Sequence, residues 1–206
     1  KINIGELEGI ADFACSSLAA KVFNLYFLVP TGRGRFVSDI SISEYNNILQ
    51  ILYKIQSDYR GKMMVNAKCA PHYYKTLFEK DPDSPMLKSY ADNAGGCPAG
   101  IQYMGIRPNG DMTPCPYLPV FGGNLKKESL NAIWNNSTVF TEIRNRTNLK
   151  NNCGSCEFAA KCGGCRARAF GETGDYLETD GLCDFIPGKY DARFIAGKNA
   201  LEYGLP

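Results

Sequence analysis

Apolar positions in the first part of the chain switch between helical and strand-like spacing. Residues 4–18 place apolar side chains three and four positions apart, which predicts a helix. Residues 21–30 form a short continuous apolar run, which predicts a strand covered on both faces. A second helix is predicted over residues 42–57, and a second strand over 63–68 that ends at Cys69.

The order helix, strand, helix, strand predicts an α/β fold with a parallel sheet. Ser41 and Glu44 stand three positions apart, as in a capping box at the start of the second helix. Two strands do not bury a parallel sheet, so we interpret residues 1–92 as the C-terminal portion of a partial parallel (β/α) barrel. Since the chain starts at Lys1 rather than Met, we expect the rest of the barrel upstream.

In parallel sheets, chemistry gathers where strands end. Residues 31–35 (TGRGR) follow the first predicted strand, and Cys69 to His72 follow the second. Arg33 is a candidate for binding a carboxylate, because a guanidinium pairs with carboxylates in bidentate fashion. The glycines beside it are equally compatible with a plain tight turn, and a single histidine such as His72 more often packs or lies on the surface.

The second half of the chain, residues 93–206, carries an ordered cysteine array. Its pattern is C-x12-G-x4-C, then C-x2-C-x5-C-x2-C, then a final cysteine. Residues 101–107 and 112–114 predict a β-hairpin whose turn contains Asn109 and Gly110. Short helices are expected over 129–134 and 139–146, and a tight loop over 153–165. The members of the array are Cys97, Cys115, Cys153, Cys156, Cys162, Cys165 and Cys183.

Thiolates are soft ligands that select zinc, copper(I) or iron–sulfur groups. Zinc would use the two short-spaced pairs, but the gap of five residues between the pairs is short for a zinc ribbon, and three cysteines remain unused. Disulfides are disfavoured by the odd count of 9 cysteines. Iron–sulfur ligation explains the excess, because the last cysteine of a closely spaced group can ligate a second cluster.

Overall composition narrows the remaining classes of function. The 23 basic and 21 acidic residues nearly balance, which gives no reason to expect nucleic acid as a partner. The longest apolar run is far shorter than a bilayer-spanning helix, so no membrane partner is expected. We predict a reducing, cytoplasmic location.

The cysteine array resembles the SPASM domain of radical S-adenosylmethionine (SAM) enzymes. The segment 123–134 looks like the helix segment between the two cysteine groups of that domain, and segments 23–34 and 68–74 look like the last strands of a radical SAM partial barrel. The segment 162–183 resembles the subgroup that acts in the alternative heme and heme d pathways. One departure is that two residues, Gly163 and Gly164, precede the sixth cysteine where the commonest form has three.

The resemblance implies two auxiliary [4Fe–4S] clusters. The first would be held by Cys97, Cys115 and Cys165, and the second by Cys153, Cys156, Cys162 and Cys183. Seven cysteines leave one of eight ligand positions open, to be filled by substrate or solvent, by Cys69, or by an oxygen ligand such as Asp111.

The resemblance also implies one-electron cleavage of SAM to a 5′-deoxyadenosyl radical, with Arg33 contacting SAM. The implied substrate is a tetrapyrrole, and a peptide is the second candidate. A ferredoxin or flavodoxin would donate the electrons. The C-x3-C-x2-C loop of the SAM-cleaving cluster is not in this sequence, so we expect it and a third [4Fe–4S] cluster in the full-length protein. The non-catalytic alternative is an iron–sulfur electron-transfer protein.

Overall fold

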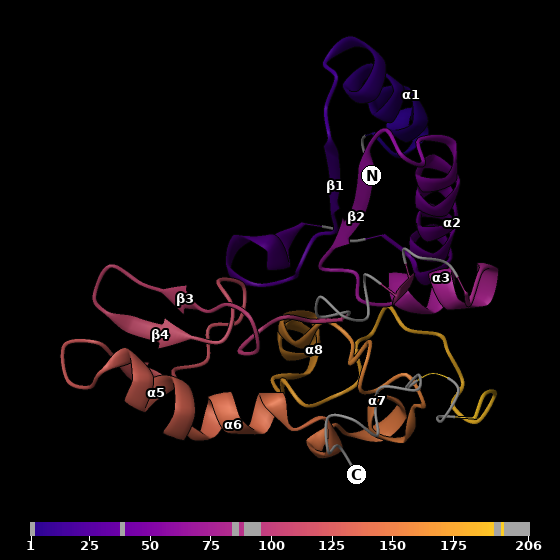
Figure 1. Cartoon of the computed structure of the whole chain (residues 1–206). Coiled ribbons are helices and arrows are strands. Elements are labelled where there is room, and N and C mark those ends of the chain that lie inside the picture. Colours follow the sequence, from indigo (N-terminus) through magenta and orange to yellow (C-terminus); the bar gives the residue numbers. More distant parts are fainter. Residues whose placement is uncertain (1–2, 38–39, 84–86, 89–95, 192–194, 196–206) are drawn as a thin grey trace.

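The computed structural model describes residues 3–37, 40–83, 87–88, 96–191 and 195. Figure 1 shows an upper part, with the β1–β2 pair and α2, standing over a lower layer that contains β3, β4, α5, α6 and α8. The boundary expected between residues 92 and 93 lies outside the described residues. No helix in the described part of the chain is long and apolar enough to span a membrane.

The chain begins with a helical stretch that changes type along its length. It comprises η1 (Ile4–Glu6), α1 (Leu7–Asp12) and the π-turn η2 (Phe13–Ser17). The predicted helix over 4–18 is therefore confirmed. Leu7 and Ala11 are its buried residues, and they join the main core.

Strands β1 (Val22–Tyr26) and β2 (Met64–Lys68) pair in parallel, as predicted. The prediction that β1 is covered on both faces is wrong, because its residues are exposed or half-buried in alternation. Val22 and Tyr26 are 48% and 62% exposed. The buried residues of the apolar run 21–30 are Phe27 and Val29, which follow the strand.

Helix α2 (Ile42–Asp58) covers the strand pair and starts at a complete capping box. The backbone N–H of Glu44 donates to the Ser41 hydroxyl at 3.2 Å, and the Ser41 N–H donates to the Glu44 carboxylate at 2.7 Å. Buried residues of α2, among them Leu49 and Leu52, share the main core with Val65 of β2. The predicted helix and its cap are confirmed.

Two short elements follow the strands. The glycine segment after β1 forms a tight 3-10 turn, η3 (Gly32–Phe36). After β2 the chain turns at Cys69 and enters α3 (Tyr73–Lys80), which the hydrophobic pattern did not predict. His72 immediately precedes α3 and is buried.

The lower layer opens with a small antiparallel sheet. Strands β3 (Gly105–Ile106) and β4 (Asp111–Thr113) form the predicted hairpin, and β5 (Gly123–Asn124) adds a third strand. Helices α5 (Leu130–Asn136) and α6 (Thr138–Arg144) follow, close to their predicted places.

The predicted tight loop over 153–165 is confirmed apart from its first three residues, which belong to α7 (Asn151–Ser155). The turn η4 (Arg146–Asn148) precedes this segment, and α8 (Arg166–Thr173) follows it. Between α7 and α8, Phe158 is 1% exposed and makes edge-to-face contacts with Tyr74 and Phe78 of α3. These aromatic contacts pack the segment against the upper part of the molecule.

Candidate metal centres

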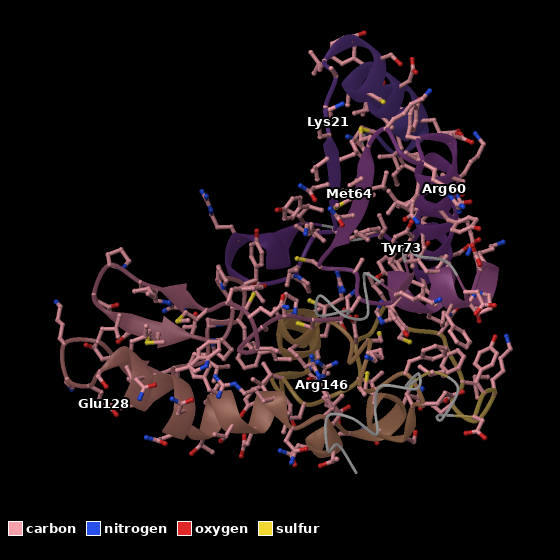
Figure 2. The ribbon with its side chains drawn as sticks, in the orientation of Figure 1. Lys21, Arg60, Met64, Tyr73, Glu128 and Arg146 are labelled. Carbon is pink, nitrogen blue, oxygen red and sulfur yellow. The ribbon has the colours of Figure 1, made fainter. Side chains whose placement is uncertain are left out.

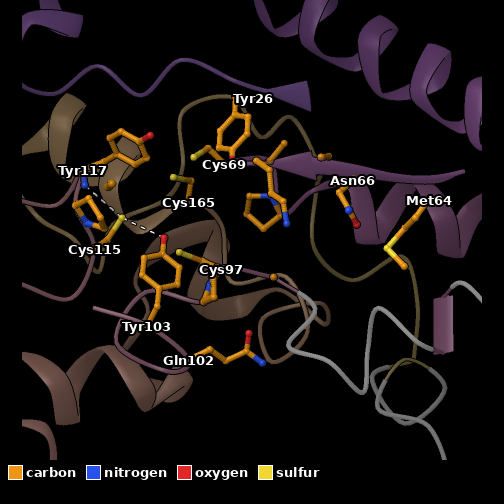
Figure 3. A pocket seen from close by; sticks show the side chains of 18 residues that line it. Tyr26, Met64, Asn66, Cys69, Cys97, Gln102, Tyr103, Cys115, Tyr117 and Cys165 are labelled. Atoms are coloured by element: carbon orange, nitrogen blue, oxygen red, sulfur yellow. Dashed lines mark hydrogen bonds between the residues drawn. The ribbon is translucent and has the colours of Figure 1, made fainter. Parts of the chain in front are cut away.

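Eight of the nine cysteines lie around two separate cavities. The first cavity has a volume of about 660 Å³ and lies where β2 ends above the lower layer. Figure 3 shows its four cysteines in one view, with one from the upper part of the molecule and three from the lower layer. They are Cys69, Cys97, Cys115 and Cys165.

The second cavity is lined by the other four cysteines of the array. Its volume is about 20 Å³, room for little more than a water molecule, so its sulfurs must move apart to hold a larger group. His72, Phe158 and Phe185 also line it. Its cysteines are Cys153, Cys156, Cys162 and Cys183.

Two consecutive glycines direct neighbouring cysteines into different cavities. Gly163 and Gly164 have φ of +63° and +59°, left-handed values that favour glycine. The turn places Cys162 on the second cavity and Cys165 on the first. A side chain at Gly164 would come within 2.9 Å of Asp180 Cβ and 3.2 Å of Cys153 Sγ. The two residues between Cys162 and Cys165 therefore form a tight turn that requires glycine at both positions.

Cys69 has a backbone conformation that non-glycine residues seldom adopt. Its φ is +59°, and holding such a conformation costs on the order of 1 kcal/mol or more. The guanidinium of Arg168 donates to the Cys69 carbonyl at 3.1 Å and to the Leu28 carbonyl at 3.0 Å. Arg168 thereby fixes the chain where it leaves both strands, and strain of this kind is typical of functional positions.

A buried polar network connects Arg168 to both cavities. Arg168 pairs with Asp180 at 3.1 Å, and both side chains are completely buried. Asp180 accepts a hydrogen bond from the Cys165 N–H at 2.6 Å through its side chain, and one from the Cys183 N–H at 3.0 Å through its carbonyl. One residue thus orients a cysteine of each cavity.

His72 occupies the other side of Asp180. Its Nδ1 lies 2.7 Å from the Tyr45 hydroxyl, and its Nε2 lies 3.7 Å from the Asp180 carboxylate. Burial lowers the pKa of His72 to about 4, so the ring is neutral near pH 7. Burial also raises the pKa of Tyr45, so its hydroxyl keeps its proton and donates to Nδ1. His72 is a packed, hydrogen-bonded histidine.

Several donors point at the cysteine sulfurs. At the first cavity, the Tyr103 hydroxyl lies 3.2 Å from Cys115 Sγ, and the Tyr117 N–H donates to it at 3.4 Å (dashed lines in Figure 3). At the second cavity, the guanidinium of Arg166 lies 3.6 Å from Cys153 Sγ. Hydrogen bonds to ligand sulfurs are a known means of tuning iron–sulfur groups.

Burial makes most of these thiols poor acids without a cation. It raises the pKa of Cys69, Cys156 and Cys183 to about 11, and raises that of Cys162 well above the usual range. Cys97 differs, because a hydrogen bond from Cys165 lowers its pKa. A bound metal group would supply the positive charge that deprotonates such thiols.

The arrangement fits iron–sulfur clusters better than single ions. A single zinc ion holds its sulfurs within about 2.3 Å of one point. Among the described residues, no three His, Cys, Asp or Glu side chains are close enough to share one metal ion. The volume of the first cavity, about 660 Å³, has room for a larger group, and its four cysteines offer an all-thiol donor set.

Two of the predicted candidates lie away from the cavities. Arg33 is exposed on η3 and is not among the residues that line either cavity, so its contact with SAM stays a prediction. The Asp111 carboxylate accepts hydrogen bonds from Asn109 at 2.7 Å and Asn124 at 2.8 Å. Asp111 therefore stabilises the hairpin turn.

Sequence reasoning missed the side chains that support the sulfurs. Arg166 and Arg168 are completely buried on α8, directly after Cys165. The sequence signal for this supporting role was the presence of two arginines one and three residues after the candidate ligand Cys165. Arg146, labelled in the lower layer in Figure 2, was also missed; it donates to the Cys97 carbonyl at 2.7 Å.

Comparison with known proteins supports the interpretation of the cysteine array as an iron–sulfur site. Residues 97–157 match the SPASM family, described as an iron-sulfur cluster-binding domain. The AdoMet-dependent heme synthase of Methanosarcina barkeri is 36% identical over 194 residues, covering 92% of this chain and 55% of that protein. The enzyme of the same name from Nitratidesulfovibrio vulgaris is 33% identical, covering 84% of this chain and 48% of that protein.

Other matches have a different named activity. A PqqA peptide cyclase of Methylorubrum extorquens is 28% identical over 210 residues, covering 97% of this chain and 50% of that protein. Streptococcus suis SuiB, solved with S-adenosylmethionine bound, superposes with a TM-score of 0.58 at 18% identity, over 88% of this chain and 42% of that one. This likeness confirms the mixed α/β fold.

The chain spans about half the length of the curated relatives that it matches. The relatives and the matched domain agree with the cysteine pattern and with the two four-cysteine cavities. This chain carries a SPASM iron–sulfur cluster-binding domain and is related in sequence to AdoMet-dependent heme synthases and to PqqA peptide cyclases.

Proposed function

We propose that the two cavities are the sites of two auxiliary [4Fe–4S] clusters. The first uses Cys97, Cys115 and Cys165, with Cys69 as the fourth ligand. The observation that carries this proposal is that Cys69, distant in the sequence, lines the same cavity as the other three. The second cluster uses the remaining four cysteines, Cys153, Cys156, Cys162 and Cys183.

We further propose that the full-length protein is a radical SAM enzyme that modifies a tetrapyrrole in heme synthesis. The heme synthase relatives, at 33% to 36% identity over most of this chain, support that substrate class. The activity needs a third [4Fe–4S] cluster, which would supply the electron that cleaves SAM. The 5′-deoxyadenosyl radical would then abstract a hydrogen atom from the substrate. In a decarboxylation, loss of carbon dioxide from the substrate radical would leave a carbon–carbon double bond, and the remaining electron would pass to an oxidised auxiliary cluster; side-chain removal is the alternative outcome.

The first cavity has features suited to such a substrate. Tyr26 at the end of β1 and Tyr117 of the lower layer both line it, and they are 62% and 45% exposed. They offer aromatic surface to a flat conjugated ring. Lys68 and Gln102 also line the cavity and can bind carboxylate side chains. Arg33, exposed on η3, remains the candidate contact for SAM, with a ferredoxin or flavodoxin as electron donor.

Peptide modification is the second candidate, because the PqqA peptide cyclases also match this chain. One experiment separates the two. Full-length protein is incubated anaerobically with SAM, a reductant, and either a carboxylated iron tetrapyrrole or a candidate peptide. We expect 5′-deoxyadenosine release coupled to loss of carbon dioxide from the tetrapyrrole. Modification of the peptide alone would support the second candidate. An absence of SAM cleavage with either substrate would support the non-catalytic electron-transfer alternative.

Iron and acid-labile sulfide analysis tests the cluster count directly. About twelve irons in the full-length protein correspond to three [4Fe–4S] clusters, and about eight correspond to two. Zinc without sulfide would refute the cluster assignment.

A further inference from the structure

Tyr103 is the side-chain hydrogen-bond partner of a cysteine at the first cavity. Its hydroxyl lies 3.2 Å from Cys115 Sγ, within the range of hydrogen bonds to sulfur (Figure 3). Tyr103 itself lines the cavity and is half-buried. The contact is therefore between the wall of the cavity and one of its sulfurs.

The backbone around Tyr103 is fixed on several sides. The Gly100 N–H donates to the Tyr103 carbonyl at 3.1 Å and to the Pro114 carbonyl at 2.8 Å. Arg144 donates to the Gly100 carbonyl at 2.7 Å, and the Arg144 guanidinium stacks on Trp134 at 4.2 Å. The turn that carries Tyr103 is thus tied to the chain entering Cys115 and to α6, so the hydroxyl is held in place before any group binds.

The direction of the hydrogen bond follows from the chemistry of the ligand. A thiolate bound to iron has no proton, so only the Tyr103 hydroxyl can donate. The Tyr117 N–H reaches the same sulfur at 3.4 Å, but this backbone donor is not removed by changing a side chain.

We propose that Tyr103 is a positioning residue for the first auxiliary cluster: its hydroxyl donates to the Cys115 sulfur and makes reduction of that cluster easier. The proposal rests on the cluster assignment above. Reduction adds one electron from the external donor, breaks no bond, and leaves the proton on the Tyr103 oxygen. The added negative charge strengthens the hydrogen bond, so the donor stabilises the reduced state more than the oxidised state.

The test is Tyr103→Phe in the full-length protein, reconstituted anaerobically and titrated with a reductant while EPR follows each cluster. At a fixed potential we expect the reduced-to-oxidised ratio of the first cluster to fall about tenfold, equivalent to ~59 mV for one electron. The matched control is Tyr26→Phe, which removes another hydroxyl from the lining of the same cavity. In the described structure, the Tyr26 hydroxyl makes no hydrogen bond to a sulfur, whereas the Tyr103 hydroxyl does. This control should leave the potential unchanged.

The outcomes are distinguishable. An unchanged potential in Tyr103→Phe with full iron content overturns this inference and leaves the cluster assignment standing. A protein without iron and sulfide at the first site overturns the cluster assignment itself.

Should Tyr103→Phe fail to retain the cluster, the unmodified protein gives the answer. Resonance Raman bands of the Fe–S(Cys) bonds should shift at once on transfer from H2O to D2O if the Tyr103 O–H donates to Cys115, because a phenol O–H exchanges immediately and the hydrogen-bonded Tyr117 N–H exchanges more slowly. This prompt shift should survive in Tyr26→Phe. Bands that do not respond to D2O overturn the inference.

Discussion

Arg168 donates a hydrogen bond of 3.1 Å to the carbonyl of Cys69, joining α8 to the residue that directly follows β2. The same guanidinium pairs with Asp180, and neither side chain is exposed. Arg168→Met would leave the Asp180 carboxylate buried without its cation. We expect the free energy of unfolding to fall by about 3–5 kcal/mol, measured by urea titration.

The control for Arg168 is an exposed ion pair. Lys54 pairs with Glu8, and their side chains are 64% and 56% exposed. Lys54→Met should leave stability unchanged within error, because exposed pairs contribute little. Equal effects of the two substitutions would contradict the role assigned to the buried pair.

The capping box of α2 gives a second prediction. Ser41→Ala removes the hydroxyl that accepts from the Glu44 N–H, and we expect a loss of about 1 kcal/mol in thermal or urea unfolding. Ser57→Ala is the control, since its hydroxyl only donates back to the Tyr53 carbonyl inside the helix. A loss from Ser57→Ala as large as that from Ser41→Ala would argue against the cap.

The cap shows which parts of the fold can be predicted from sequence. Ser41 and Glu44 are three residues apart, so their interaction is local and visible in the pattern. The parallel pairing of β1 and β2 was also predictable, from the alternation of helix and strand. Helix α8 was missed because its two arginines, usually surface residues, are buried. Arg168 lies against Asp180 and the strand ends, and Arg166 donates to the carbonyls of Tyr176 and Glu178.

The grouping of the cysteines depended on tertiary structure. The resemblance to SPASM domains implied two sets of sulfurs but left one ligand position open between Cys69, Asp111 and substrate or solvent. The fold places Cys69 on the first cavity and uses Asp111 in the hairpin turn. No local signal could decide this, because Cys69 reaches the cavity only through the packing of β2 on the lower layer.

The double-glycine turn supplies a third prediction. Gly164→Ala adds a side chain that crowds Asp180 and Cys153 at a left-handed position. We expect iron to be lost from the second site, measured as iron per protein after anaerobic reconstitution. Gly174→Ala has a similar φ of +81° but meets nothing within 4 Å, so it should cost about 1–2 kcal/mol of stability and retain iron. Equal iron content in the two variants would contradict the crowding argument.

The most direct test of the account concerns Cys69 as the fourth ligand of the first cluster. Cys69→Ala is compared with Cys15→Ala, which changes a half-buried cysteine outside both cavities. In the full-length protein, we predict that Cys69→Ala alters the EPR signal of one cluster or removes about four irons. Cys15→Ala should match the unmodified protein. If Cys69→Ala keeps its full iron content and an unchanged EPR spectrum, Cys69 is not a ligand and the four-cysteine account of the first cavity is wrong.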